Sequence, residues 1–81
     1  MMAGAGQLQA QEIPVSQVPA AALEHFQRTW PAALDVEWEL KGTQYQVEFE
    51  TGLYGVDHEV WYDAAGKFLK HEEEIAEQEL P

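Results

Sequence analysis

The chain has 81 residues, no cysteine, and 15 acidic against four basic residues, for a formal net charge of −11 at pH 7. Without cysteine, disulfides and thiolate metal sites are excluded, and the length fits one small domain with no run that could cross a bilayer. The acidic balance argues against nucleic acid or an anionic membrane surface as a partner, because both carry charge of the same sign.

The N-terminal segment 1–11 is rich in small and polar residues, and we expect it to be disordered. Leu8-Gln9-Ala10 suggests the cleavage end of a secretory signal, although the basic and apolar regions of such a signal are missing. Our hypothesis is a signal-peptide remnant, which predicts a periplasmic or secreted protein. Mass spectrometry of the native protein would contradict this if it showed an intact, longer N-terminus.

Two short stretches of the chain echo each other. Glu12-Ile13 with Val18-Pro19 is repeated as Glu74-Ile75 with Leu80-Pro81, at an offset of 62 positions (74 − 12). A fixed offset of this kind indicates a tandem repeat. We therefore expect a single domain over residues 12–75 and the start of a truncated second repeat over residues 76–81.

A helix is predicted between two prolines. Ser16 is the expected N-cap, Pro19 suits the first helical position, and Pro31 ends the helix after Trp30. The apolar residues of this segment fall on one helical face and require a partner to pack on: Ala22, Leu23, Phe26 and Trp30.

Residues 34–50 alternate between apolar and polar side chains, which is typical of two strands with one buried face. A two-residue turn at Lys41-Gly42 predicts a hairpin in which Leu34, Val36, Trp38 and Leu40 face the core opposite Phe49, Val47, Tyr45 and Thr43, respectively. The acidic residues between them then face solvent.

A second hairpin is predicted over residues 56–74. In its first strand, Val56, His58, Val60 and Tyr62 point to the core, and the loop 63–67 has Gly66 in the left-handed position. Pairing Asp63 with Lys67 places Trp61 opposite Leu69 and Glu59 opposite His71, but it also places Val60 opposite Lys70. The choice of Phe68 or Leu69 as the buried residue stays open. A bulge in this hairpin is one way to avoid the unfavourable pairing of Val60 with Lys70. The predicted fold class is α+β, with one N-terminal helix on a four-stranded antiparallel meander.

The order and spacing of several motifs resemble the PepSY-like family, which shares the fold of beta-lactamase-inhibitor proteins and includes many envelope proteins of Bacteroidetes. The matching residues are Pro19, Leu23, Phe26, Trp30-Pro31 and Ala33, then Val36-Glu37-Trp38-Glu39, Tyr45-x-Val47-Glu48-Phe49 and Val60-x-Tyr62-Asp63-x2-Gly66-Lys67. The resemblance implies one helix on a four-stranded sheet, often in tandem, with a signal peptide in front. It implies no catalytic residues, and inhibition of a protein target is a role proposed for related segments.

The sequence carries no recognisable catalytic motif. The three histidines lack a helical ligand spacing, and we interpret His58 with Glu72, and His71 with Glu59, as ordinary cross-strand polar pairs rather than a metal site. Asp57, Glu59 and Asp63 do not match the spacing of a calcium loop. We therefore predict no enzyme activity, no cofactor and no dedicated metal site.

The function favoured by the sequence is a non-catalytic module that binds a protein or peptide with a basic surface, and that inhibits it in one version of the hypothesis. Trp61 is expected to supply apolar contact area on an acidic face, unless neighbouring side chains or a second repeat simply cover it. The candidate binding residues are Trp61, Glu37, Glu39, Glu48, Glu59 and Leu69. Two alternatives stay open, namely a calcium-binding envelope protein that uses clustered carboxylates, and a structural repeat or homodimer formed through an open sheet edge.

Overall fold

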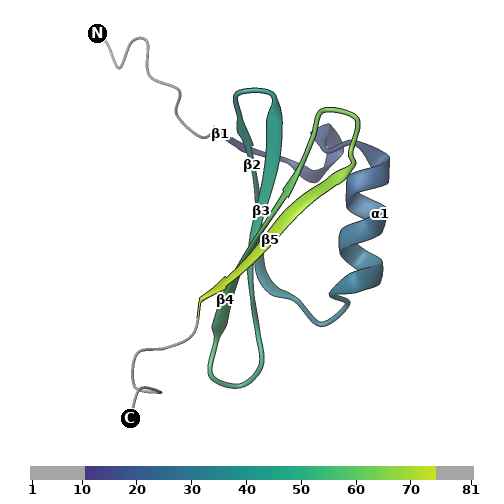
Figure 1. Ribbon diagram of the computed structural model, residues 1–81. Helices are drawn as coiled ribbons and strands as arrows, with labels where there is room; N and C mark the ends of the chain where they lie inside the picture. Colours follow the sequence, from purple (N-terminus) through teal and green to yellow (C-terminus); the bar gives the residue numbers. More distant parts are fainter. Residues whose placement is uncertain (1–10, 75–81) are drawn as a thin grey trace, which may run out of the picture.

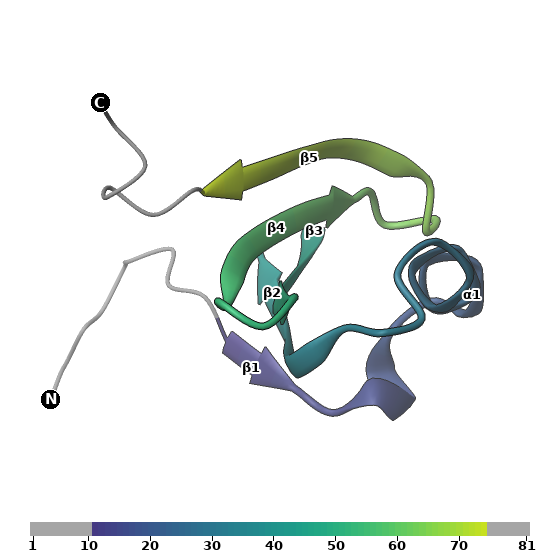
Figure 2. The same cartoon turned by 90° about the horizontal axis from the view of Figure 1, so that it is seen from below.

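The computed structural model describes residues 11–74, which form an α+β fold with one α-helix on a five-stranded antiparallel sheet (Figure 1). The strands follow one another in the sheet in chain order, and helix α1 lies against one face of the curved sheet (Figure 2). The helices of this part of the chain are too short and too polar to cross a bilayer. The elements are β1 (Gln11–Ile13), the 3-10 helix η1 (Val15–Gln17), α1 (Ala20–Thr29), β2 (Leu34–Lys41), β3 (Gln44–Thr51), β4 (Val56–Tyr62) and β5 (Phe68–Glu74).

The predicted meander of four strands is one strand short. The additional strand, β1, pairs with the second half of β2, and it begins at Gln11, the last residue of the segment that we expected to be disordered. Three residues are too few for an alternating pattern to stand out in a sequence. The remaining tail, the proposed signal cleavage end, the last residue of the predicted domain, Ile75, and the expected second repeat over residues 76–81 lie outside the described residues.

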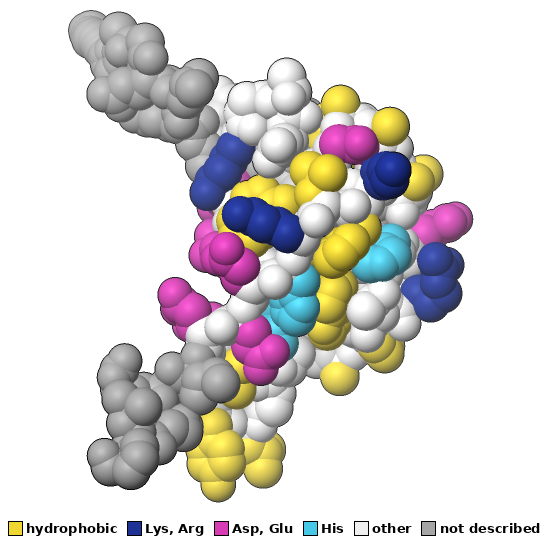
Figure 3. Space-filling view, viewed as in Figure 1, with side chains coloured by type: hydrophobic (Ala, Val, Ile, Leu, Met, Phe, Trp, Pro, Cys, Tyr) yellow, Lys and Arg dark blue, Asp and Glu magenta, His cyan; other side chains and the backbone are white. Residues whose placement is uncertain are grey.

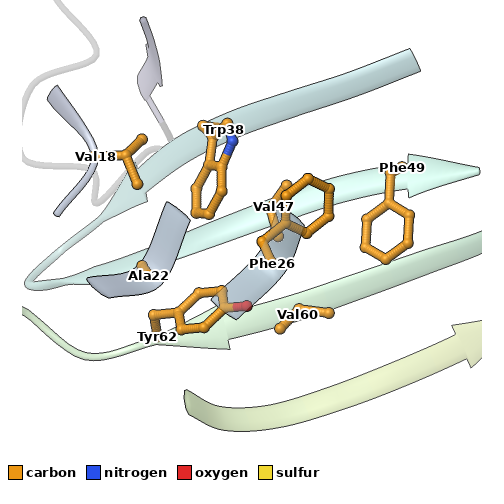
Figure 4. Packing of buried hydrophobic residues seen from close by; sticks show 8 residues of the cluster. All are labelled: Val18, Ala22, Phe26, Trp38, Val47, Phe49, Val60 and Tyr62. Atoms are coloured by element: carbon orange, nitrogen blue, oxygen red, sulfur yellow. The ribbon is translucent and has the colours of Figure 1, made fainter. Parts of the chain in front are cut away.

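The core lies between α1 and the sheet, as the apolar patterns predicted (Figure 4). The ring of Phe26 meets the rings of Trp38 and Phe49 edge-on, with centroid distances of 5.6 and 5.0 Å. Edge-on aromatic pairs add to the stabilisation that comes from buried area alone. The buried hydrophobic residues are Val18, Ala22, Phe26, Trp38, Val47, Phe49, Val60 and Tyr62.

Helix α1 begins and ends where the prolines indicated, but Ser16 does not cap it. Ser16 lies within η1, and Pro19 is the N-cap residue without a side-chain hydrogen bond. The backbone carbonyl of Pro19 accepts the first helical hydrogen bond from the N–H of Leu23 at 3.1 Å. A proline at this boundary leaves one fewer N–H group to satisfy, so a side-chain cap is less necessary.

The first hairpin has the predicted faces but a register shifted by two residues. Lys41 pairs with Gln44, and Trp38 therefore lies opposite Val47 rather than Tyr45. The loop consists of Gly42 and Thr43, and Gly42 has a φ of 63°. A two-residue turn with one positive φ at its first position requires glycine there, and this requirement sets the register. Because the shift is even, each side chain keeps its face.

The start of β2 departs from the prediction more strongly. The register shifts between Leu34 and Glu37, and Asp35 has a positive φ of 51°. Such a bulge breaks the alternation of side chains along the strand. Leu34 and Val36, which we expected in the core, are accordingly exposed to 55% and 40%.

The second hairpin also contains a bulge. Tyr62 pairs with Phe68, but Trp61 pairs with Lys70 instead of the predicted Leu69, so Leu69 is the extra residue. Neither Phe68 nor Leu69 is buried, although the ring of Phe68 packs near that of Tyr62 at 6.2 Å. From this point on, β5 is offset by one residue from the predicted pairing.

Candidate functional site

The sheet has a second face, away from α1, on which carboxylates from adjacent strands stand directly opposite each other. One row runs across four strands as Glu37, Glu48, Glu59 and Glu72, and a second row comprises Glu50, Asp57 and Glu74. We call this surface the open acidic face, and Figure 3 shows acidic side chains gathered on the side of the sheet away from α1. Its carboxylates belong to Glu12, Glu37, Glu39, Glu48, Glu50, Asp57, Glu59, Glu72 and Glu74.

The arrangement is electrostatically unfavourable within the chain itself. Burial raises the pKa of Glu48, and repulsion by Glu39 and Glu37 raises it further. Burial also raises the pKa of Glu59, with Glu48 as the largest repulsive neighbour. Like charges directly opposite each other destabilise a sheet. The face therefore carries a repulsion that a cation would relieve.

Little positive charge compensates these carboxylates. Within residues 11–74, the side chains form one ion pair, in which Lys70 Nζ lies 3.6 Å from a carboxylate oxygen of Glu72. Both side chains are well exposed, and exposed pairs contribute little to stability. Lys41 lowers the pKa values of Glu48 and Glu59, but it does not offset the causes that raise them.

The carboxylates surround a shallow hollow with a volume of about 320 Å³. Asp35, which lies at the bulge near the start of β2, also lines this hollow. The hollow also touches Phe49 and His58 from the other side of the strands. Its acidic lining consists of Asp35, Glu37, Glu48, Glu50, Asp57, Glu59 and Glu74.

The structure brings together most of the residues predicted for the binding site. Glu37, Glu48 and Glu59 form one row, and Glu39 lies in the next row towards the Gly42 turn. Trp61 is on this face, half-buried, with Lys70 Nζ 4.5 Å from the centre of its ring. Leu69 does not pair with Trp61, because the bulge replaces it with Lys70.

Gln46 is a feature of the same face that the sequence did not reveal. It lies opposite Glu39 on one side and Trp61 on the other, and it is only 1% exposed. Its side-chain oxygen is buried without a hydrogen-bond donor among the described residues. A buried acceptor without a donor is costly, and it adds to the negative potential of the face.

The histidine pairs expected between β4 and β5 are not formed. Glu59 lies opposite Glu72, whereas His71 lies opposite Val60 on the face that carries the core. There His58 Nδ1 and His71 Nε2 are 3.0 Å apart. The one-residue offset that the bulge introduces moves His71 across the sheet, and this contact could not be derived from the hairpin pattern.

Comparison of the chain with models of protein families, with curated proteins and with solved structures found no match.

Proposed function

We propose that the open acidic face binds a basic segment of a protein or peptide without catalysing a reaction. The observation that carries this proposal is the row of carboxylates on neighbouring strands, where burial, with repulsion between neighbouring carboxylates added to it, raises the pKa values of Glu48 and Glu59. Lysine or arginine side chains laid across this row would replace repulsion by attraction. Charge complementarity of this kind also accelerates association and selects against acidic partners.

The role of Trp61 in this proposal differs from that of a free apolar anchor. Lys70 already covers its ring in a cation–π contact. An incoming arginine or lysine would exchange with Lys70 over the same ring, and Lys70 would then pair more closely with Glu72. Such contacts are worth about 0.5–1 kcal/mol at exposed sites, so Trp61 contributes selectivity for cations rather than most of the affinity.

The resemblance to PepSY-like proteins, with their envelope location and proposed inhibitory roles, belongs to the same proposal. A periplasmic or secreted protein would meet basic segments of other envelope or extracellular proteins. The partner protein would be inhibited if its own activity required the bound basic segment. The resemblance supports the kind of partner but not its identity.

The open acidic face suits an extended partner better than a calcium ion. The side chains of Glu37, Glu39 and Glu48 each offer an oxygen, and these oxygens lie within 4.8 Å of one another. Calcium takes six to eight oxygen ligands, so three carboxylates leave much of its shell to water. Dimerisation through the β5 edge is also disfavoured, because it would bring the acidic residues Glu72 to Glu74 of two chains together.

The proposal is tested by fluorescence anisotropy with a labelled lysine- and arginine-rich peptide, in the presence of a chelator. We expect binding that weakens as salt rises, because ions screen exposed charges over about 10 Å at 0.1 M. The double variant Glu48→Gln, Glu59→Gln should bind at least several-fold more weakly. The matched control, Glu24→Gln with Glu73→Gln, removes the same charge away from the open acidic face and should bind as the wild type does.

Equal loss of affinity in both double variants would mean that the peptide responds only to net charge, and the proposed face would be wrong. A peptide in which glutamine replaces every lysine and arginine serves as the second control. If that peptide bound as tightly as the basic one, charge would not be the basis of recognition.

A further inference from the structure

On the other face of the sheet, beyond the C-terminal end of α1, three side chains with metal-binding atoms meet. They belong to His58 on β4 and to His71 and Glu73 on β5, where Glu73 is the direct cross-strand partner of His58. One ligand atom from each residue lies within 4.8 Å of those of the other two. His58 is buried, whereas His71 and Glu73 are exposed, so the group is open to solvent from the β5 side.

The two imidazoles already point a nitrogen at each other. His58 Nδ1 lies 3.0 Å from His71 Nε2, and one proton shared between these atoms makes the hydrogen bond. Tetrahedral zinc binds nitrogen at about 2.0–2.1 Å, which places two such nitrogens about 3.3 Å apart. The observed separation needs to open by only a few tenths of an ångström to admit an ion.

A second contact orients the buried ring from behind. His58 Nε2 lies 2.7 Å from Thr51 Oγ1. When Nε2–H donates to this oxygen, the lone pair of Nδ1 is left for an ion. Metal-binding histidines nearly always have such an oxygen partner on the second nitrogen, because it fixes the tautomer and the ring orientation.

Aromatic neighbours hold both rings in place. Phe49 stacks on His58 with a centroid distance of 4.8 Å and an angle of 2°. Trp30 packs edge-on against His71 at 5.0 Å, and the two histidine rings are themselves nearly parallel, at 14°. The two rings therefore have little freedom left to lose when an ion binds, which favours affinity.

We propose that His58, His71 and Glu73 bind a divalent transition metal ion such as Zn²⁺. Imidazole nitrogen with one carboxylate is a donor set that suits zinc, copper and nickel, whereas calcium and magnesium prefer oxygen alone. The ion takes the place of the proton between the rings, and that proton moves from Nε2 to Nδ1 of His71, so that both imidazoles bind the ion as neutral ligands. The carboxylate of Glu73 is the third ligand, and a fourth position stays open to water. The negative charge of the chain favours the entry of any cation.

The test is isothermal titration calorimetry of the full chain with Zn²⁺, at neutral pH in a buffer that does not bind zinc. We expect one ion per chain and a melting temperature that rises with zinc, because the ion binds the folded state. His71→Gln should lower the affinity at least tenfold, since even second-layer partners of a metal ligand are worth about 10–100-fold. His25→Gln, which removes a histidine from the helix, is the control and should bind zinc as the wild type does.

A charge-matched pair separates this site from the open acidic face. Glu73→Gln removes the proposed ligand, and Glu72→Gln removes the same charge from the adjacent residue on the opposite face. Of these two variants, only Glu73→Gln should weaken zinc binding. Thr51→Val should also weaken it, by about 10–100-fold, without removing a ligand. Equal effects of Glu73→Gln and Glu72→Gln, or a calcium response as large as that to zinc, would overturn the proposal. His71→Gln binding zinc as the wild type does would overturn it as well.

Discussion

The two faces of the sheet are made by alternate residues of the same strands, yet their energetics are opposite. On the face under α1, Val47, Phe49 and Val60 are almost fully buried, and aromatic rings pack against one another. On the open acidic face, Glu48 and Glu59 lie directly opposite each other with raised pKa values. The packing on the first face stabilises the fold, whereas the repulsion between carboxylates on the second face destabilises it.

This difference is informative about function. Glutamine or threonine at the open positions would keep the strands solvated without the repulsion, so stability does not explain the rows of carboxylates. Places where a chain departs from local stability rules are expected to be functional sites. The comparison therefore supports the proposal that the open acidic face has a role other than folding.

The largest expected effect comes from the covered face. Phe26→Ala removes the ring that joins α1 to Trp38 and Phe49, and it should lower the free energy of unfolding by about 3–5 kcal/mol. Urea denaturation monitored by circular dichroism measures the change. If Phe26→Ala and Glu59→Gln shifted the midpoint by equal amounts, the proposed contrast between the faces would not hold.

An intermediate effect is expected where the loop between β4 and β5 meets the start of α1. Gly66 has a φ of 90°, and a Cβ added there would lie 2.9 Å from the backbone nitrogen of Ala22. Gly66→Ala should therefore cost about 2–5 kcal/mol, from the strained backbone and the forced contact together.

The matched control for this substitution is Gly42→Ala in the first hairpin. Gly42 has a φ of 63° and no atom near the position of a Cβ, so only the backbone strain of about 1–2 kcal/mol applies. Thermal or urea unfolding of both variants gives the difference. A larger loss for Gly42→Ala would show that the contact between the loop and α1 is unimportant.

The smallest effect is expected on the open acidic face, and its sign is opposite. Glu48→Gln or Glu59→Gln should stabilise the fold by a few tenths of a kcal/mol to about 1 kcal/mol, because each removes a cross-strand repulsion. A folded-state pKa above the usual 4.5 means that the folded chain binds protons more tightly than the unfolded chain. These two groups therefore add stability as the pH falls from neutral towards 4.5, and they lose that contribution as the pH rises through the raised values.

Melting curves of the wild type and of the double variant Glu48→Gln, Glu59→Gln over this pH range check the sign. The difference between the two curves isolates the carboxyl groups from the histidines, which both proteins share. The wild type should approach the variant in stability at the acidic end. Curves that run parallel would show that neither burial nor repulsion raises the pKa values of these two groups.

Predictions from the sequence were most reliable for features that depend only on residues close together in the chain. The prolines placed α1, alternation identified the buried row of β4, and Gly66 marked the left-handed position of its loop. The acidic face followed from the same alternation, so Glu37, Glu48 and Glu59 were predicted together and are found together. The sequence analysis did not foresee the bulge at the start of β2, and it gave a bulge in the second hairpin only as one way to resolve an unfavourable pairing. A bulge depends on how a strand pairs and not on the residues of one strand.

Local patterning therefore determined the class of the fold and the separation of apolar from acidic side chains, since a period of two assigns residues to faces without knowledge of the partner strand. Tertiary pairing decided the register, the fifth strand and the partners on each face. The one-residue offset at Leu69 brings Lys70 to Trp61 and His71 to His58. Both contacts exist only because neighbouring strands must align all their hydrogen bonds at once, and a single strand read along its own sequence carries no record of that alignment.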